Sequence, residues 1–157
     1  MLETCETLRE VLNLRGGTWS RFRLKPPPAD DVDATATDKD GQVLYVQVTR
    51  VERRAWRQLA EDGASESQKS PDDLAEDIRG AIEAKARKHS PSQRSQLVLA
   101  LDARRSPGHA RQVVVNAFLA ANGPWVTGLG YRAAWLVGPT PDSTHKLCLD
   151  AEGGSQD

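Results

Sequence analysis

Polar side chains recur at alternate positions in two neighbouring segments of the chain, within residues 31–51. The first segment, DVDATATD, carries Asp31 and Asp33, and the second, QVLYVQVTRV, carries Gln47 and Thr49. The sequence KDG between them is typical of a three-residue hairpin loop that ends in glycine. A hairpin would bring carboxylate, amide and hydroxyl groups together, and such groups bind ligands and substrates through hydrogen bonds.

The loop length decides which residues of this hairpin face each other. With residues 39–41 in the loop, Asp33 lies opposite Gln47 and Asp31 lies opposite Thr49, with the side chains on one face. The other face then carries apolar side chains suited to a core: Val32, Ala34, Ala36, Val46 and Val48. A two-residue loop would shift the register by one residue and lose both features.

Each of these polar residues also has a structural interpretation. Aspartates before a hairpin often serve turn geometry. Asp33 fits that interpretation poorly, because it lies within the β-patterned segment. Gln47 and Thr49 could equally be polar residues on a solvated sheet face, and the sequence leaves this alternative open.

Arginines follow the second segment at positions i, i+3, i+4 and i+7: Arg50, Arg53, Arg54 and Arg57. If this stretch is helical, the four side chains lie on one face and could neutralise the phosphates of a nucleic acid. Arg21 and Arg23 on a preceding strand could extend the patch. A stripe of charges is also typical of a solvated helix face.

Lys85 lies on the apolar stripe of a predicted helix whose start is well marked. Ser70 can cap that helix and Pro71 suits its first position. The stripe consists of Leu74, Ile78, Ala81, Ile82 and Lys85. A lysine on a buried face requires a partner, or its side chain extends along the helix to reach water.

The remaining periodicities complete the order of elements. Helices are predicted over residues 2–14, 70–89 and 108–123, and strands over residues 18–24, 31–38, 42–51, 96–103, 131–138 and 145–150. A strand meander followed by strand–helix–strand crossovers indicates an α/β fold, bordering on α+β, in which helices cover both faces of a mixed central sheet. We expect one domain over residues 1–150, a loop at 58–69 and a flexible C-terminal tail at 151–157.

The composition limits the class of protein. The chain has 157 residues, of which 38% are hydrophobic and 27% charged, as in a soluble globular domain with a core. It shows no apolar run of membrane-spanning length and no apolar signal-peptide core, so we expect a cytoplasmic protein without a membrane partner. Cys5 and Cys148 lack ligand spacing and read as free thiols. The net charge of −1 argues against a protein that is basic throughout, although a local patch could still bind nucleic acid.

The element order and the hairpin residues together resemble the restriction-endonuclease-like, or PD-(D/E)xK, nuclease superfamily. The likeness covers about residues 2–137. In that superfamily an Asp on the second strand precedes Glu-x-Lys on the third. Asp33 or Asp31 takes the Asp position here, Gln47 takes the Glu position and Thr49 takes the Lys position. The chain thus resembles a divergent member with Gln-x-Thr in place of Glu-x-Lys.

The resemblance implies a catalytic site and a metal. Asp33, Asp31 and Gln47 would bind Mg²⁺ or Mn²⁺, which polarises a phosphate and activates a water molecule. Asp33, Gln47, Thr49 and Lys85 would then form the catalytic set, with Lys85 replacing the absent strand lysine, as occurs in this superfamily. The implied reaction is hydrolysis of phosphodiester bonds in DNA, or in RNA.

The substituted positions also favour alternatives. Glu6 or Glu10 of the first helix could add a missing carboxylate. The chain could instead be a catalytically inactive member of the same fold that binds nucleic acid or assembles with proteins, or a small protein-binding domain. We expect nucleic acid as the partner, DNA more than RNA, and the sequence leaves a homodimer or a larger complex open.

Overall fold

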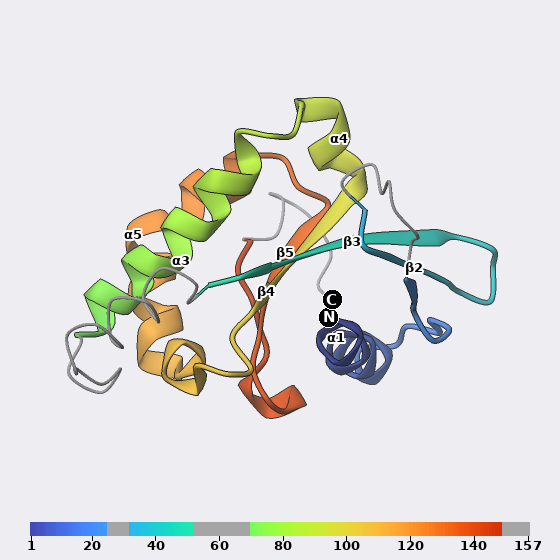
Figure 1. Ribbon diagram of the computed structural model, residues 1–157, viewed down its shortest axis with the longest axis horizontal. Coiled ribbons are helices and arrows are strands. Elements are labelled where there is room, and N and C mark those ends of the chain that lie inside the picture. The colour runs from blue at the N-terminus through green and yellow to red at the C-terminus, as the bar shows by residue number, and fades with distance from the viewer. Residues whose placement is uncertain (25–31, 52–69, 149–157) are drawn as a thin grey trace.

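The computed structural model describes residues 1–24, 32–51 and 70–148 of the chain (Figure 1). Its helices are α1 (Leu2–Leu14), α3 (Pro71–Ala86), α4 (Pro91–Gln96) and α5 (Gln112–Gly128), with short 3₁₀ turns η2 (Pro107–Ala110) and η3 (Pro141–Ser143). Its strands are β1 (Arg23–Leu24), β2 (Ala34–Thr37), β3 (Val43–Arg50), β4 (Leu97–Asp102), β5 (Ala133–Val137) and β6 (His145–Lys146). The predicted α/β class is confirmed.

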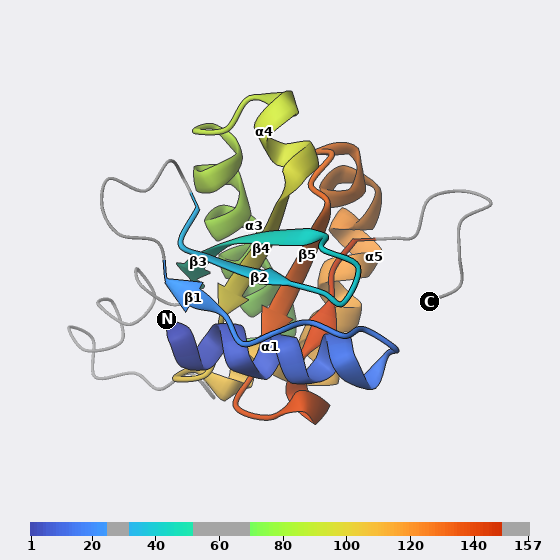
Figure 2. The same cartoon turned by 90° about the vertical axis from the view of Figure 1, so that its right-hand side faces the viewer.

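The strands form one mixed sheet in the order β1-β2-β3-β4-β5-β6. The strands β1 to β3 are antiparallel, β3 to β5 are parallel, and β6 returns antiparallel to β5. Helices α3 and α5 lie on one face of the sheet and α1 crosses the other, as Figures 1 and 2 show. The predicted mixed sheet with helices on both faces is therefore present.

Two apolar cores fill the spaces between the sheet and its helices. Under α1, the buried side chains of Leu8 and Val11 meet Val46 and Trp135 of the sheet. Under α3 and α5, the larger core consists of residues from both helices and from β4, including Leu74, Ile78, Ile82, Phe118, Leu99 and Leu101. Because β4 contributes to both cores, its nearly continuous apolar sequence is what a strand covered on both faces requires.

The hairpin between β2 and β3 has the predicted loop and register. Asp38 N–H donates to the Gln42 carbonyl at 3.0 Å, and Gly41 lies at φ +83°, which glycine adopts without steric cost. The Asp38 carboxylate also accepts from the N–H groups of Asp40 and Gln42. The strand pairs that follow, from Thr37 with Val43 to Ala34 with Val46, keep this register.

The helix boundaries agree with the local signals only in part: α3 ends at Ala86 rather than at residue 89, and α5 begins at Gln112, because Pro107–Ala110 form the 3₁₀ turn η2. Helix α3 begins with the predicted cap, as Ser70 and Asp73 form a reciprocal capping box. Helix α4 was not predicted, although Ser90, Pro91 and Gln93 form the same kind of start. Helix α5 runs through Pro124 to Gly128, beyond the predicted end at residue 123, because the burial of Val126 against the core offsets the lost hydrogen bond of the proline.

Arg94 of α4 ties together the ends of two long helices. Its Nη1 donates to the carbonyls of Ala86 at 3.0 Å and His89 at 3.1 Å, just after α3. Its Nε donates to the carbonyl of Leu129 at 2.7 Å, at the end of α5. Helix ends leave carbonyl groups without intrahelical partners, and a cation there is favourable to the helix dipole. A single guanidinium therefore satisfies both helix ends at once.

Replacing Arg94 by alanine should lower the free energy of unfolding by about 2–4 kcal/mol, because three carbonyl oxygens lose a charged donor. Urea denaturation followed by circular dichroism measures the loss. Arg94→Lys should recover only part of it, since one ammonium does not reproduce the planar fork. The exposed Arg87→Ala is the control, expected within about 0.5 kcal/mol. A loss for Arg94→Ala no larger than that of the control would contradict this role.

Candidate functional site

Asp33 lies at the point where β2 leaves regular pairing with β3. Its N–H donates to the Val46 carbonyl at 2.9 Å, and its Oδ2 accepts from the Val48 N–H at 2.8 Å. In the regular register the carbonyl of Val32 would accept from Val48, so the side chain of Asp33 has taken the place of a main-chain acceptor. The carboxylate thus has a structural partner on the backbone of β3.

This departure changes the face on which the neighbouring side chains lie. Val32 packs against the core under α3 and α5, whereas Ala34 is buried in the core under α1. The strict alternation that would put both on one face is broken at Asp33, and the prediction of a common core face is wrong for Val32. Burial raises the pKa of the Cys5 thiol in α1, and the charge of the Asp33 carboxylate adds to that rise.

Gln47 and Thr49 lie on the opposite side, toward α3. Gln47 is only 7% exposed, and its Oε1 has no hydrogen-bond partner within the described part of the chain. Thr49 lines a pocket together with residues of α3. The expected notch of Asp33 facing Gln47 and Thr49 is therefore not formed, because the Asp33 carboxylate turns to the Val48 N–H instead.

The pocket beside Thr49 lies between the end of β3 and α3 and has a volume of about 500 Å³. Lys85 of α3 and Lys88 in the turn after it line the pocket, as does Arg50 at the exposed end of β3. Its other described lining residues are Val51, Glu76, Asp77, Gly80, Ala81 and Ala84. Lys85 is thus on the hairpin side of α3, where the sequence placed it, and shares a pocket with Thr49.

Asp77 and Lys88 are lining residues that the sequence analysis did not single out. Asp77 Oδ2 lies 2.9 Å from Nε2 of the buried His109, so its carboxylate is held by a partner. Lys88 follows Lys85 by three residues, a spacing that places both side chains on one helix face. That spacing was the available signal for Lys88, whereas the contact between Asp77 and His109 has no signal in the sequence.

A second pocket, of about 440 Å³, lies over the β1–β2 end of the sheet. Arg21 and Arg23 line it together with the hydroxyl groups of Ser20, Thr35 and Thr37. None of its described lining residues is acidic; the remaining two are Phe22 and Ala36. This end of the sheet therefore offers two guanidinium groups and several hydroxyl donors.

One row of paired residues runs across the sheet from the β1–β2 pocket to the core beneath the helices. Arg23 pairs with Thr35, Thr35 with Tyr45, and Tyr45 with Leu97, so these side chains share a face. Leu97 is buried beneath the helices, Tyr45 is partly buried and Arg23 is exposed. We call this partly uncovered surface the open face, made of Arg21, Arg23, Thr35, Thr37, Tyr45 and Thr49 and bordered by Arg50, Lys85 and Lys88. Gln47 lies on the same side of β3 but is buried.

The donors expected to bind Mg²⁺ or Mn²⁺ do not fit a metal site on this face. Asp33 is engaged by Val48 and lies away from Gln47, and Asp31 lies outside the described residues. Within residues 1–24, 32–51 and 70–148, no three His, Cys, Asp or Glu side chains are grouped closely enough to hold an ion. Glu6 does not contribute to a metal site either, since its carboxylate accepts from the N–H of Phe22 and pairs with Arg9.

The predicted arginine stripe is described only in part. Arg50 ends β3 and is exposed beside the α3 pocket. Arg53, Arg54 and Arg57 lie outside the described residues, as does the predicted loop at 58–69. The contribution of the stripe to the open face therefore stays a prediction.

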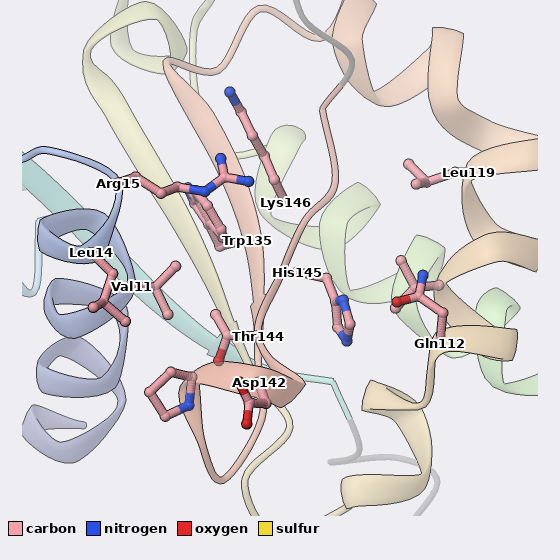
Figure 3. Close-up of a pocket in the computed structure, with 12 residues that line it drawn as sticks. Val11, Leu14, Arg15, Gln112, Leu119, Trp135, Asp142, Thr144, His145 and Lys146 are labelled. Atoms are coloured by element: carbon pink, nitrogen blue, oxygen red, sulfur yellow. The ribbon is translucent and has the colours of Figure 1, made fainter. Parts of the chain in front are cut away.

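Figure 3 shows a different pocket, between α1, α5 and the β5–β6 end of the sheet. The guanidinium of Arg15 lies 5.2 Å from the centre of the Trp135 ring, and Nε2 of His145 bonds to the Ala110 carbonyl at 2.9 Å. Val11 and Leu14 of α1 supply apolar walls. None of the residues singled out in the sequence for catalysis or metal binding lines this pocket.

In comparisons with protein-family models, curated proteins and solved structures, the chain has no match. The resemblance to restriction-endonuclease-like nucleases therefore stays a prediction that rests on the hairpin residues and the element order. None of the described helices combines the length and the apolar character that crossing a membrane requires.

Asp33→Ala should reduce the free energy of unfolding by about 1–3 kcal/mol, because the partly buried Val48 N–H loses its acceptor. Asp33→Asn should cost less, since the amide oxygen can still accept. Chemical denaturation measures both, with the exposed loop variant Asp40→Ala as a control expected within about 0.5 kcal/mol. An Asp33→Ala protein as stable as the control would show that the carboxylate has no structural function.

Burial raises the pKa of the Cys5 thiol to about 12 from an ordinary value of 9.0, and the nearby carboxylate of Asp33 raises the pKa as well. Below pH 9 the thiol is protonated in both the folded and the unfolded chain. Between pH 9 and about 12 the thiol is protonated in the folded chain and loses its proton in the unfolded chain. Stability from this group therefore falls by about 1.4 kcal/mol per pH unit between the two pKa values. The stability difference between wild type and Cys5→Ala should narrow from pH 9 to 10.5 in urea titrations, and a constant difference would contradict the assignment.

Proposed function

We propose that the chain binds nucleic acid, with the open face contacting the phosphate backbone. The arrangement of cations supports this proposal. Arg21 and Arg23 line one end of the face, and Arg50, Lys85 and Lys88 line the pocket at the other end. Thr35, Thr37 and Thr49 supply hydroxyl donors between them, and such donors commonly bind phosphate oxygens.

The distribution of charge matters more here than the total. The chain has 21 Lys and Arg against 22 Asp and Glu, so its overall field does not attract a polyanion. The β1–β2 pocket has no acidic lining residue among those described. The described lining of the α3 pocket has two, of which Asp77 is held by His109 and Glu76 is exposed, against the three cations Arg50, Lys85 and Lys88. Local fields of this kind are sufficient for salt-dependent binding of phosphates.

Metal-dependent hydrolysis of the bound strand is the second candidate. One observation favours it: Lys85, the expected substitute for the strand lysine, shares a pocket with Thr49. The position of Asp33 argues against it, because its carboxylate is engaged by the Val48 N–H at the edge of the β2–β3 pairing. Binding without cleavage is therefore the function that the arrangement of side chains supports best.

The double variant Lys85→Ala/Lys88→Ala should bind a fluorescein-labelled oligonucleotide about 10-fold more weakly at 100 mM salt, measured by fluorescence anisotropy. The slope of log affinity against log salt should become shallower by about 1–2, because up to two phosphate contacts are lost. Arg105→Ala removes an exposed cation outside the open face and should leave both quantities unchanged.

Equal loss in the Arg105 variant would point to non-specific attraction and contradict the assigned surface. Gel analysis of the same oligonucleotide incubated with Mg²⁺ or Mn²⁺ decides between the two candidates. Intact strands support binding alone. Cleavage that depends on the metal and disappears in Lys85→Ala would establish hydrolysis in its place.

A further inference from the structure

Tyr45 places an aromatic ring at the boundary between the covered and the open parts of the sheet. It lies in one row between Thr35 on the open side and Leu97, which is buried beneath the helices. The ring packs partly against the core and is partly exposed. No hydrogen bond of its hydroxyl group occurs within the described residues, so packing alone positions the ring.

Gln47 is the next residue on the same face and carries an unsatisfied amide. The residue is 7% exposed, and its Oε1 lacks a hydrogen-bond partner among the described residues. A buried polar atom without a partner is unusual in a folded protein, and it can mark a place that a ligand completes. An amide offers one acceptor and two donors, which match the donor and acceptor pattern on the edge of a nucleobase.

Cations lie on both sides of Tyr45 and Gln47, along the part of the sheet from β1 to β3. Lys85 at the end of α3 and Lys88 in the turn after it lie on one side, and Arg23 of β1 lies on the other. The strip from β1 to β3 spans two strand spacings, about 10 Å. That width suits one polynucleotide strand whose phosphates follow the lysines and whose bases turn toward the sheet.

We infer that the open face binds unpaired bases, so that its ligand is single-stranded nucleic acid; this rests on the proposed function. A base stacks against Tyr45, and its hydrogen-bonding edge meets the Gln47 amide. In a duplex the bases stack on each other and pair internally. No base then has a free face on which the ring of Tyr45 could stack. Stacking on aromatic side chains together with a basic groove is a general mode of single-strand binding.

The test compares a 12-residue single strand, a duplex of the same length and an abasic single strand by fluorescence anisotropy. The single strand should bind at least 10-fold more tightly than the duplex. Tyr45→Leu, which keeps an apolar side chain against the core, should weaken single-strand binding about 5- to 100-fold without changing the salt slope. Tyr45→Phe should retain wild-type affinity, and this variant separates stacking from loss of folding.

Gln47→Met removes the amide at similar volume and tests the second contact. It should weaken binding of the single strand but leave binding of the abasic strand unchanged. Equal affinity for single strand and duplex, with Tyr45→Leu like wild type, would overturn the inference while leaving backbone binding intact. Failure to bind any oligonucleotide would overturn the proposed function itself.

Discussion

The hydrogen bond between the Asp33 carboxylate and the Val48 N–H decides how the hairpin joins the rest of the sheet. It supplies the acceptor that a regular strand would take from the main chain, so the chain can leave the β-ladder at this point without an unpaired donor. Val32 is then free to enter the core under α3 and α5. The same bond engages the acidic side chain just before β2, so that this carboxylate is not available to bind a metal beside Gln47 and Thr49.

The open face follows from the mixed topology of the sheet. Parallel strands are normally covered on both faces, and the parallel part of this sheet lies between α1 and the pair α3 and α5. Antiparallel strands need only one covered face, so the β1–β3 end can keep polar and charged side chains opposite α1. Helix α3 stands at the junction, where Lys85 and Lys88 face the end of β3. A protein of nearly neutral net charge thereby gathers cations around one strip of sheet.

The fold could be predicted well wherever a local signal had no strong competitor. Ser70 and Pro71 begin α3, and the length of the loop before Gln42 fixes the hairpin register. The prediction failed at Pro124, where burial of the following turn outweighed the usual disruption of a helix by proline. The prediction also failed for the candidate site. The alternation of side chains along a strand puts Asp33 and Gln47 on the same face only if the pairing of β2 with β3 stays regular as far as Asp33, and it does not.

The sequence by itself determined the long helices α1 and α3, the hairpin register and the position of Lys85 on the apolar stripe of α3, because each depends on residues close together in the chain. Only the tertiary structure decided that the Asp33 carboxylate bonds to the Val48 N–H, and that Arg21, Arg23, Lys85 and Lys88 border one surface. These outcomes depend on hydrogen bonds and packing between distant segments, which compete with local periodicity and here outweigh it.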